Sequence, residues 1–454
     1  MSAASSTITL TILGGGGFRV PLVHAALLRD TLPGRVTHLR LHDNDQQRLD
    51  AVAAVLAEQR DGVTGAPEVS LHTNLDEALR GADVVFSAIR VGGLAGRALD
   101  ERLPLKHHLL GQETVGVGGI SYGLRTLPVV THIAERIKAV APQAWVINFT
   151  NPAGVVTEAL APILGERVVG ICDSPVGLAR RAMLAAGVSA DDRAGVEVDY
   201  CGLNHLGWVT GLRLGERDLL TPLLADEAAL TSFEEGRLFG AEWLAALGAL
   251  PNEYLHHYYF AREDLAQALT QSQTRAEQIL DQQQDFFGVD PSTPGAFERW
   301  ERTRMARELT YMQLNRDAAG SFEREESDLT GGGYEEVALA IMHAIIHDRP
   351  ATLILNRPNQ GRLTTLDDDA VIEAPCLVDA AGFHPLPTAL PDHGVGLVQQ
   401  VKYVERRTLA AAASGSRAEA WRALAAHPLV DSVTVARQLL DELVSAHTEL
   451  AYLR

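Results

Sequence analysis

The sequence predicts an α/β protein: an N-terminal Rossmann-like, doubly wound parallel sheet, followed by a mixed α/β, helix-rich part. Three observations predict this class. Short β-branched apolar runs alternate with helical patterns over the first 170 residues, as in consecutive βαβ units. The first apolar run leads directly into four glycines. Beyond residue 230, longer helical patterns dominate the chain.

The first strand is expected at residues 7–13, and a helix at 21–30 opens on Pro, which suits a first helical position. Between them lie Gly14, Gly15, Gly16 and Gly17. Backbone N–H groups at the start of such a helix can hold a pyrophosphate. Gly14 and Gly16 fit the G-x-G-x-x-G pattern, but Arg19 stands at its third glycine place. A dinucleotide site is favoured over a plain glycine turn.

A carboxylate follows the second strand, which is expected at residues 37–42. Asp43 begins an Asp-Asn-Asp run at the tip of this strand, where the ribose hydroxyls of a dinucleotide would be bound. It comes somewhat later than the spacing of about 20 residues in the simple fingerprint. An acid at this place favours NAD over NADP because it would repel a 2′-phosphate.

The alternation of strands and helices continues to about residue 170. Helices are expected at 45–60, 75–80 and 153–163, and strands at 69–73, 83–89 and 144–150. This order predicts parallel strands with helices on both faces of one sheet.

Polar side chains follow the later strands of this sheet. Arg90 comes directly after strand 83–89, Glu113 lies in a glycine-rich run, and strand 144–150 leads into Asn151. In a doubly wound sheet, the loops at the carboxyl ends of strands gather over the cofactor crevice. Arg90, Glu113, Asn148 and Asn151 are therefore candidates to face one cavity, although each also has a plain structural interpretation.

A thiol and an imidazole stand at the ends of two further predicted strands. Cys172 follows the apolar run 167–171, and His205 follows the alternating run 196–200. A thiolate and a neutral imidazole can share one divalent transition metal. Taken alone the pair is weak evidence, since a Cys in an apolar strand is more often inert core. The nucleotide-binding pattern upstream raises its weight.

The remainder of the chain is mostly helical. Helical patterns cover about 233–248, 261–287, 296–315, 334–347 and 417–450. Strand 208–214 is expected to pair antiparallel with 196–203, and segments 351–355 and 370–377 suggest a small second sheet. The amphipathic C-terminal helices are expected to pack on the body or on a second subunit. We therefore predict an NAD-binding Rossmann-like domain at 1–170 and a metal-binding catalytic and oligomerisation domain at 171–454.

The charge and cysteine content of the chain limit the kinds of partner and the cellular compartment that it is expected to have. The formal charge of −19 and a sequence pI near 5.3 argue against a nucleic-acid or anionic-membrane surface. Three scattered cysteines are too few for a disulfide framework, which fits a reducing cytoplasm. No apolar run approaches the roughly 18 residues of a membrane span, and the first residues lack the basic region of a signal peptide.

Several phrases of the sequence occur in an order that resembles glycoside hydrolase family 4, the NAD- and metal-dependent glycosidases. Among its members the chain most resembles the 6-phospho-β-glucosidases. The phrases are the glycine turn, Arg-Val-Gly-Gly from 90, the run 111–119, Asn-Phe-Thr-Asn-Pro from 148, Gly-Ile-Cys-Asp from 170, Gly-Leu-Asn-His-Leu from 202, Asn-Glu-Tyr-Leu from 252 and Glu-Ala-Pro-Cys from 373. One such phrase would be weak, but together they span most of the chain.

The resemblance implies roles for individual residues. Cys172 and His205 match the metal ligands, with Mn²⁺ the usual ion, and Tyr254 matches the catalytic base. Asp173 matches the proton donor of the α-specific members, which leaves the anomer open. The cofactor set is Gly14, Gly15, Gly16, Gly17, Phe18 and Asp43. The substrate set is Arg90, Asn151, Arg275, Asn204, Arg19 and Glu113, with Arg19 a possible phosphate contact in place of the family's usual Ser or Thr.

The implied reaction explains why a redox cofactor would serve a hydrolase. Hydride transfer from the sugar's C3 to NAD⁺ would make the C2 proton acidic, and a metal on the C2 and C3 oxygens would stabilise the resulting enediolate. Elimination would expel the aglycone, water would add, and the hydride would return to C3. The expected substrate is a phosphorylated glycoside, and the expected assembly is a cytoplasmic homodimer or homotetramer.

Alternatives remain open at this stage. Within the family, the chain is also compatible with an α-glycosidase, a galactosidase or a uronidase. Outside it, a lactate/malate-type NAD-dependent dehydrogenase would share the first domain but would need a catalytic His paired with an acid and no metal. A non-enzymatic NAD-binding sensor would bind the nucleotide without hydrolysing any aryl glycoside.

Overall fold

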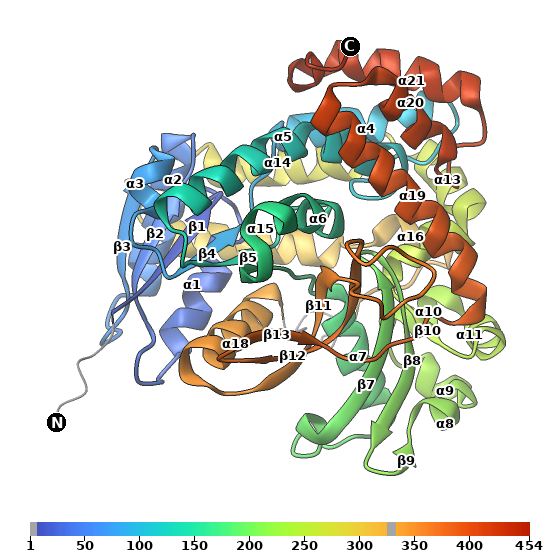
Figure 1. Ribbon diagram of the computed structural model, residues 1–454, viewed down its shortest axis with the longest axis horizontal. Coiled ribbons are helices and arrows are strands. Elements are labelled where there is room, and N and C mark those ends of the chain that lie inside the picture. Colours follow the sequence, from blue (N-terminus) through green and yellow to red (C-terminus); the bar gives the residue numbers. More distant parts are fainter. Residues whose placement is uncertain (1–6, 325–332) are drawn as a thin grey trace.

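The computed structural model describes residues 7–324 and 333–454. Its strands form one continuous mixed sheet in the order β10-β8-β7-β12-β11-β6-β5-β4-β1-β2-β3, with β13 and β9 as side strands (Figure 1). Helices cover both faces of this sheet. The α/β class that the sequence predicted is therefore confirmed.

The first six strands form the parallel part of the sheet. They are β1 (Ile8–Leu13), β2 (Val36–His42), β3 (Glu68–His72), β4 (Val84–Ser87), β5 (Trp145–Asn148) and β6 (Val168–Gly170). Their spatial order, 3-2-1-4-5-6, is that of dinucleotide-binding folds, in which ligands bind outside the carboxyl ends of the strands.

Two groups of helices bury the apolar faces of the parallel strands. One face packs against α1 (Val20–Arg29), α2 (Gln46–Gln59) and α18 (Tyr334–His347). The opposite face packs against α3 (Leu75–Leu79), α5 (Gly116–Val140) and α6 (Ala153–Leu164). Burial of strands on both faces explains why their sequences are nearly continuous apolar runs.

Between residues 93 and 185, three helices appear where loops were expected or no element was predicted. They are α4 (Gly93–Lys106), α5 and α7 (Ser174–Ala185). The turn between α4 and α5 is so tight that a Cβ on Gly111 would lie 1.8 Å from the carbonyl oxygen of Glu101. A Cβ on Gly118 would lie 1.9 Å from the carbonyl oxygen of Gln112. The glycines that suggested an irregular loop thus serve close backbone packing.

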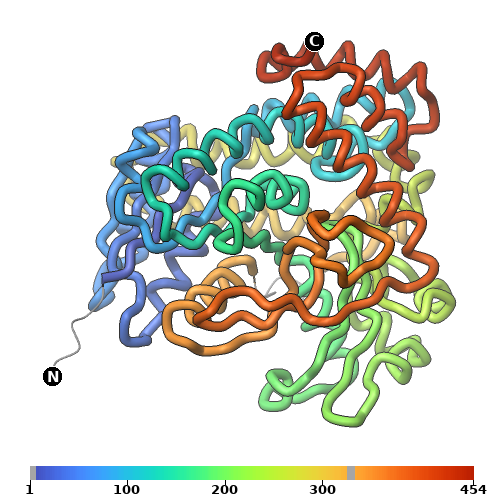
Figure 2. The backbone as a smooth tube through the Cα atoms, viewed as in Figure 1, coloured from blue at the N-terminus to red at the C-terminus, as the bar shows by residue number. Residues whose placement is uncertain are grey.

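The antiparallel strands continue the same sheet. They are β7 (Val196–Leu203), β8 (Leu206–Leu214), β9 (Arg217–Asp218), β10 (Leu250–Pro251), β11 (Ala351–Pro358), β12 (Val371–Asp379) and β13 (Gly382–Pro385). The predicted pairing of β7 with β8 is confirmed. The prediction of a small second sheet is wrong, because β11 joins β6 and β12 joins β7 (Figure 2, orange strands). The division of the chain at residue 170 stays a prediction.

Most of the long helical patterns are interrupted. The segment 233–248 breaks at Gly240, where φ is +77°, and 261–287 breaks before a Thr274 capping box. The resulting helices include α10 (Glu234–Phe239), α11 (Ala241–Leu247), α13 (Ala261–Thr270), α14 (Arg275–Phe287), α15 (Ala296–Leu309), α16 (Gln313–Ala318), α20 (Arg417–Ala426) and α21 (Val433–Ala446). Shorter helices are α8 (Leu220–Leu224), α9 (Glu227–Leu230) and α12 (His256–Tyr259). The helix expected at 334–347 is α18, but two of the three glycines before it lie outside the described residues.

The C-terminal helices pack on the body of the molecule. Helix α19 (Asp392–Ser414), which the sequence analysis did not predict, crosses α5, while α20 and α21 share an apolar cluster with α4 and α5 (Figure 1, red helices). This agrees with one of the two expectations for this region. Within the described residues, no helix is both long and apolar enough to span a membrane.

A buried ion pair joins α4 to α5. Both nitrogens of the Arg125 guanidinium donate to the Asp100 carboxylate, at 2.8 and 2.6 Å, and each side chain is about 1% exposed. His447 contacts the same carboxylate at 3.1 Å, so the pair also anchors the C-terminus.

We predict that Asp100→Asn lowers the free energy of unfolding by about 3–5 kcal/mol, because it leaves the Arg125 charge buried without its partner. Asp76→Asn is the matched control, since it breaks the half-exposed pair of Asp76 with Arg136. Chemical denaturation of both variants beside the wild type measures the effect. Equal midpoints for the two variants would contradict it.

Candidate active site

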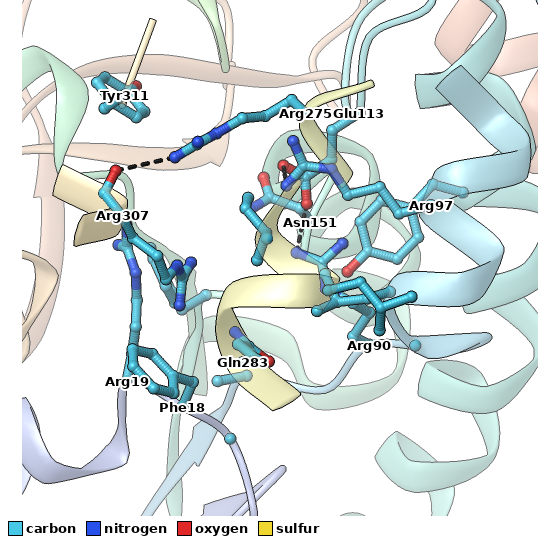
Figure 3. Close-up of a pocket in the computed structure, with 18 of the residues that line it drawn as sticks. Phe18, Arg19, Arg90, Arg97, Glu113, Asn151, Arg275, Gln283, Arg307 and Tyr311 are labelled. Carbon is cyan, nitrogen blue, oxygen red and sulfur yellow. Dashed lines mark hydrogen bonds and ion pairs between the residues drawn. The ribbon is translucent and has the colours of Figure 1, made fainter. Parts of the chain in front are cut away.

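A single large cavity, of about 1330 Å³, lies over the carboxyl ends of the parallel strands. Residues from the strand loops form one side, and residues from α14, α15 and the loop after α15 form the other. Figure 3 shows Arg90, Arg97 and Glu113 facing Arg19 and Arg307 across this space. The cavity is therefore built jointly by the two halves of the chain.

The glycine turn and Asp43 form one end of the cavity. The N–H groups of Gly14 and Gly15 both donate to the carbonyl of His42, at 2.9 and 2.7 Å. Gly16 N–H donates to the Asp43 carboxylate at 3.0 Å. A Cβ on Gly14 would lie 2.5 Å from the carbonyl oxygen of Ala88, so the turn requires glycine there. Gly14, Gly17, Phe18 and Asp43 line the cavity, whereas Gly15 and Gly16 support the turn from behind.

Phe18 is also a packing residue. Its ring is surrounded by Phe286, Phe287 and Trp300, and it is 6% exposed. This cluster holds helices α14 and α15 against the glycine turn. Phe18 thus positions the opposite wall in addition to bordering the cavity.

A charged group formed by Arg90, Arg97 and Glu113 occupies the middle of the cavity wall. Both arginines pair with the Glu113 carboxylate, Arg97 at 2.7 Å. Burial disfavours the carboxylate, but the two guanidinium charges win and lower the pKa of Glu113 to about 2. Arg97 also pairs with Glu101 at 2.7 Å, so two acidic side chains face the two guanidinium groups.

Asn151 presents an unpaired acceptor. Its Oδ1 is buried, lacks a hydrogen-bond partner, and belongs to a residue that lines the cavity. Asn148 does not line the cavity, which corrects the expectation for it. Its Nδ2 donates to Thr150 O, Ala153 O and Thr157 Oγ1, so its role is to hold the loop that carries Asn151.

Cys172, His205 and Tyr254 line the same part of the cavity. The rings of His205 and Tyr254 stack with centroids 3.8 Å apart. Burial lowers the pKa of His205 to about 4, so at neutral pH the ring is uncharged and keeps a lone pair. Burial, and then the charge of Glu373, raises the pKa of Cys172. A cation would have to reverse this effect to obtain a thiolate ligand.

These donors suit a borderline-soft divalent cation, since they offer sulfur, imidazole nitrogen and the free amide oxygen of Asn151. Across 7–324 and 333–454, no group of three or more His, Cys, Asp or Glu side chains gathers as a metal site. Cys172 and His205 would consequently need oxygen ligands of another kind to complete a shell.

Asp173 and Arg19 both line the cavity, and they form an ion pair at 3.3 Å. The Arg19 carbonyl accepts a hydrogen bond from Tyr334, whose ring stacks on Phe149 at 4.1 Å. Arg19 is therefore held as part of the wall, and its side chain is directed to Asp173.

Arg275 and Arg307 are half-buried cations without a carboxylate partner among the described residues. Arg275 donates to Thr310 Oγ1 and to the carbonyl of Arg307. Arg307 lies over the Phe18 ring, and its Nε has no partner. Burial, and then repulsion by Arg97, lowers the pKa of Arg275 to about 10. Burial, and then repulsion by Arg19 and Arg275, lowers the pKa of Arg307 to about 9. The sequence analysis found Arg275 but missed Arg307.

Two further polar residues, Glu253 and Tyr311, were missed. Burial, and then the charge of Glu235, raises the pKa of Glu253 to about 7. The hydroxyl of Tyr311 donates to Glu253 Oε1 at 3.1 Å and lies 3.4 Å from the hydroxyl of Tyr254. Glu253 stands inside the phrase that pointed to Tyr254, whereas nothing in the sequence singles out Tyr311.

Asn204 is the one predicted substrate contact that does not line this cavity. Its Oδ1 accepts from Ala153 N–H at 3.1 Å, and its Nδ2 donates to Glu373 at 3.3 Å. Both ends of the amide are thus occupied by the protein. The structure brings together the remaining predicted contacts: Arg19, Arg90, Glu113, Asn151, Arg275, Cys172, Asp173, His205 and Tyr254.

Known proteins share both the sequence pattern and the fold. Over 458 residues, 96% of each chain, the sequence is 34% identical to a probable 6-phospho-beta-glucosidase of Bacillus subtilis. It is 29% identical to the maltose-6′-phosphate glucosidase of the same organism, over 98% of this chain and 96% of that protein. The structure of the 6-phospho-beta glucosidase from Thermotoga maritima with manganese, NAD⁺ and glucose-6-phosphate superposes with a TM-score of 0.81 and 26% identity, covering 98% of this chain and 100% of that one.

The match to a family covers most of the chain. Residues 9–187 match the family 4 glycosyl hydrolases, and residues 200–430 match the C-terminal domain of the same family. With a cavity that places a glycine turn beside a thiol, an imidazole and a phenol, the chain belongs to glycosyl hydrolase family 4.

Proposed function

We propose that this protein hydrolyses 6-phosphoglucosides, with β-linked substrates preferred, and that it does so with NAD and a divalent cation such as Mn²⁺. The 6-phosphate is assigned to Arg275 and Arg307, which line the cavity, are half-buried and make no ion pair among the described residues. Two uncompensated guanidinium groups in a cavity wall are suited to bind a dianionic phosphate.

NAD is assigned to the end of the cavity that carries the glycine turn. The turn leaves the start of α1 open for a pyrophosphate, and the Asp43 carboxylate favours free ribose hydroxyls over a 2′-phosphate. The Thermotoga maritima relative contains NAD⁺ and manganese, which supports both cofactors.

The cation is assigned to Cys172 and His205, with Asn151 as a third protein group near the sugar. When bound, NAD⁺ would reversibly accept a hydride from C3 of the sugar, and the cation would stabilise negative charge on the C2 and C3 oxygens. The cavity is suited to the cation because the neutral imidazole of His205 and the unpaired amide oxygen of Asn151 belong to residues that line it.

Tyr254 is assigned the removal of the C2 proton. Its ring lies on that of His205, so its phenol is held beside the place of the cation. Burial, and then the charge of Glu253, raises the pKa of Tyr254 well above 10 in the protein alone. The phenol thus needs nearby positive charge to act as a base, which explains why base and metal ligand are neighbours.

The preference for a β-linkage rests on the Bacillus subtilis relative with 34% identity, which is described as a probable 6-phospho-beta-glucosidase. The expected cytoplasmic location and the expected homodimer or homotetramer stay predictions.

The decisive experiment is a panel of nitrophenyl α- and β-glucosides and galactosides, each with and without a 6-phosphate. We expect rapid cleavage of the 6-phospho-β-glucoside only when NAD⁺ and Mn²⁺ are both present, and products formed in D₂O should carry deuterium at C2. Mass spectrometry of the product sugar detects the exchange. Cleavage without C2 exchange, or without either cofactor, would exclude the proposed reaction. Faster cleavage of the α-glucosides would contradict the proposed preference for β-linked substrates.

We predict that Tyr254→Phe lowers kcat on this substrate by about 10²–10⁴-fold, the usual contribution of a positioned base. Tyr258→Phe is the matched control, because Tyr258 is a neighbouring, partly buried phenol that does not line the cavity. Both variants are compared by steady-state kinetics and by C2 exchange. Full activity of Tyr254→Phe would remove this residue from the role of base.

We predict that Arg307→Gln raises KM for the 6-phosphorylated substrate by about 10–100-fold, the range expected when a charge-assisted hydrogen bond is lost. KM for the substrate without phosphate should change little. Arg304→Gln is the control, since Arg304 also lines the cavity but is bound by Glu301 at 2.7 and 2.6 Å. A similar loss on both substrates would place the phosphate elsewhere.

A further inference from the structure

A buried carboxylate beside the cavity gathers three donors. Asp264, in α13, is fully buried, and its Oδ2 accepts from His257 Nδ1 and from Asn315 Nδ2, each at 2.7 Å. His256 Nδ1 lies 2.9 Å from the other oxygen. Burial opposes ionisation, but these contacts prevail and lower the pKa of Asp264 to about 2. The cluster therefore contains a fixed negative charge that orients two neighbouring imidazoles.

The rings of His257 and His256 differ in their surroundings on the side away from Asp264. His257 lines the cavity, is 3% exposed, and its Nε2 has no hydrogen-bond partner. His256 does not line the cavity, and its ring stacks on Phe260 with centroids 4.6 Å apart. In the imidazole tautomer whose Nδ1 donates to the Asp264 carboxylate, Nε2 carries a lone pair. The cavity wall thus presents a rigidly oriented hydrogen-bond acceptor.

The position of this acceptor associates it with the sugar rather than with its phosphate. The ring centroids of His257 and Tyr254 are 6.3 Å apart, and Tyr254 in turn stacks on His205. Arg275, by contrast, is the first residue of α14, and Arg307 lies in the last turn of α15. A phosphate would also repel a lone pair on Nε2, whereas a hydroxyl would satisfy it.

An unpaired buried acceptor is costly unless a ligand satisfies it. Asp264 would still have contacts from His256 and Asn315 without His257, so anchoring the carboxylate does not by itself account for the second imidazole. The arrangement resembles the way a carboxylate fixes the tautomer of a functional histidine.

We propose that His257 is a substrate-contacting residue whose Nε2 accepts a hydrogen bond from one hydroxyl group of the bound glucose unit. Asp264 is then a positioning residue, which fixes the His257 ring with Nε2 toward the cavity. The proposal rests on the proposed function, since it takes a sugar as the ligand of this cavity.

The test compares His257→Phe with His256→Phe, the matched variant of the imidazole that faces away. Dissociation constants of the holoenzyme with NAD⁺ and Mn²⁺ are measured by calorimetry. The ligands are glucose 6-phosphate and four analogues that each lack the hydroxyl at C1, C2, C3 or C4. We expect His257→Phe to weaken glucose 6-phosphate by about three- to tenfold. We expect no weakening of the one analogue whose missing hydroxyl is the partner.

Two results would overturn the proposal: His257→Phe weakens all five ligands by one factor, or it weakens none. His257→Gln, which restores an acceptor, should recover part of the binding, and it serves in place of His257→Phe if that variant does not melt cooperatively. His256→Phe should not show selectivity among the five ligands.

The same series without phosphate separates this proposal from the proposed function. If the wild type binds glucose as tightly as glucose 6-phosphate, the phosphate assignment fails, and the five unphosphorylated sugars still decide the role of His257. If no sugar of either series binds, both proposals are overturned.

Discussion

The continuous sheet depends on two junctions between strands, which we call seams, and on the buried side chain of Glu373 beside them. β11 joins β6 through the single pair Asn356 and Gly170, and β12 joins β7 through the single pair Glu373 and Gly202. A Cβ on Gly170 would lie 2.3 Å from Thr157 Oγ1, so this seam requires glycine. Glu373 accepts hydrogen bonds from the side chains of Asn356, Asn204 and Tyr200, at 2.8, 3.3 and 3.0 Å. Glu373, on β12, thus connects β11 with β7 and the turn that follows β7.

This junction determines where the chemistry is located. The seam at Gly170 immediately precedes Cys172, and Gly202 precedes the turn that carries His205. Asn204 extends from Glu373 to the backbone of Ala153, next to the loop that carries Asn151. The soft ligands and the free amide oxygen therefore come from three segments that are fixed by the same polar network. Asn204 acts on the site through this network, which accounts for its place in a phrase typical of the family.

Features that depend on a few consecutive residues could be predicted from the sequence. The glycine turn, Asp43, Cys172, His205 and Tyr254 were found because each lies in a short phrase at a strand end or turn, and all but the supporting glycines of the turn line the cavity. Helices α4 and α5 were missed because Pro104, Pro128 and several glycines within them favour loops, and tertiary packing overrides that preference. The seams were missed because one residue pair leaves no periodic pattern. Arg307 lies in a helix rich in charges, and only its packing over Phe18 brings it to the cavity.

The charge of the whole chain is a poor guide to what this cavity binds. The protein carries a formal charge of −19, and acidic side chains line the cavity as well, yet Arg275 and Arg307 make no ion pair among the described residues. Asp173 pairs with Arg19, while Glu113 and Glu101 pair with Arg90 and Arg97. Arg275 and Arg307 are left without such partners among the described residues. These groups are half-buried, and Coulomb interactions are stronger in such surroundings than in bulk water. A distant acidic surface therefore does little to this local field. Arg19, which follows the glycine turn, pairs with Asp173. An anion is therefore expected to bind at Arg275 and Arg307 instead.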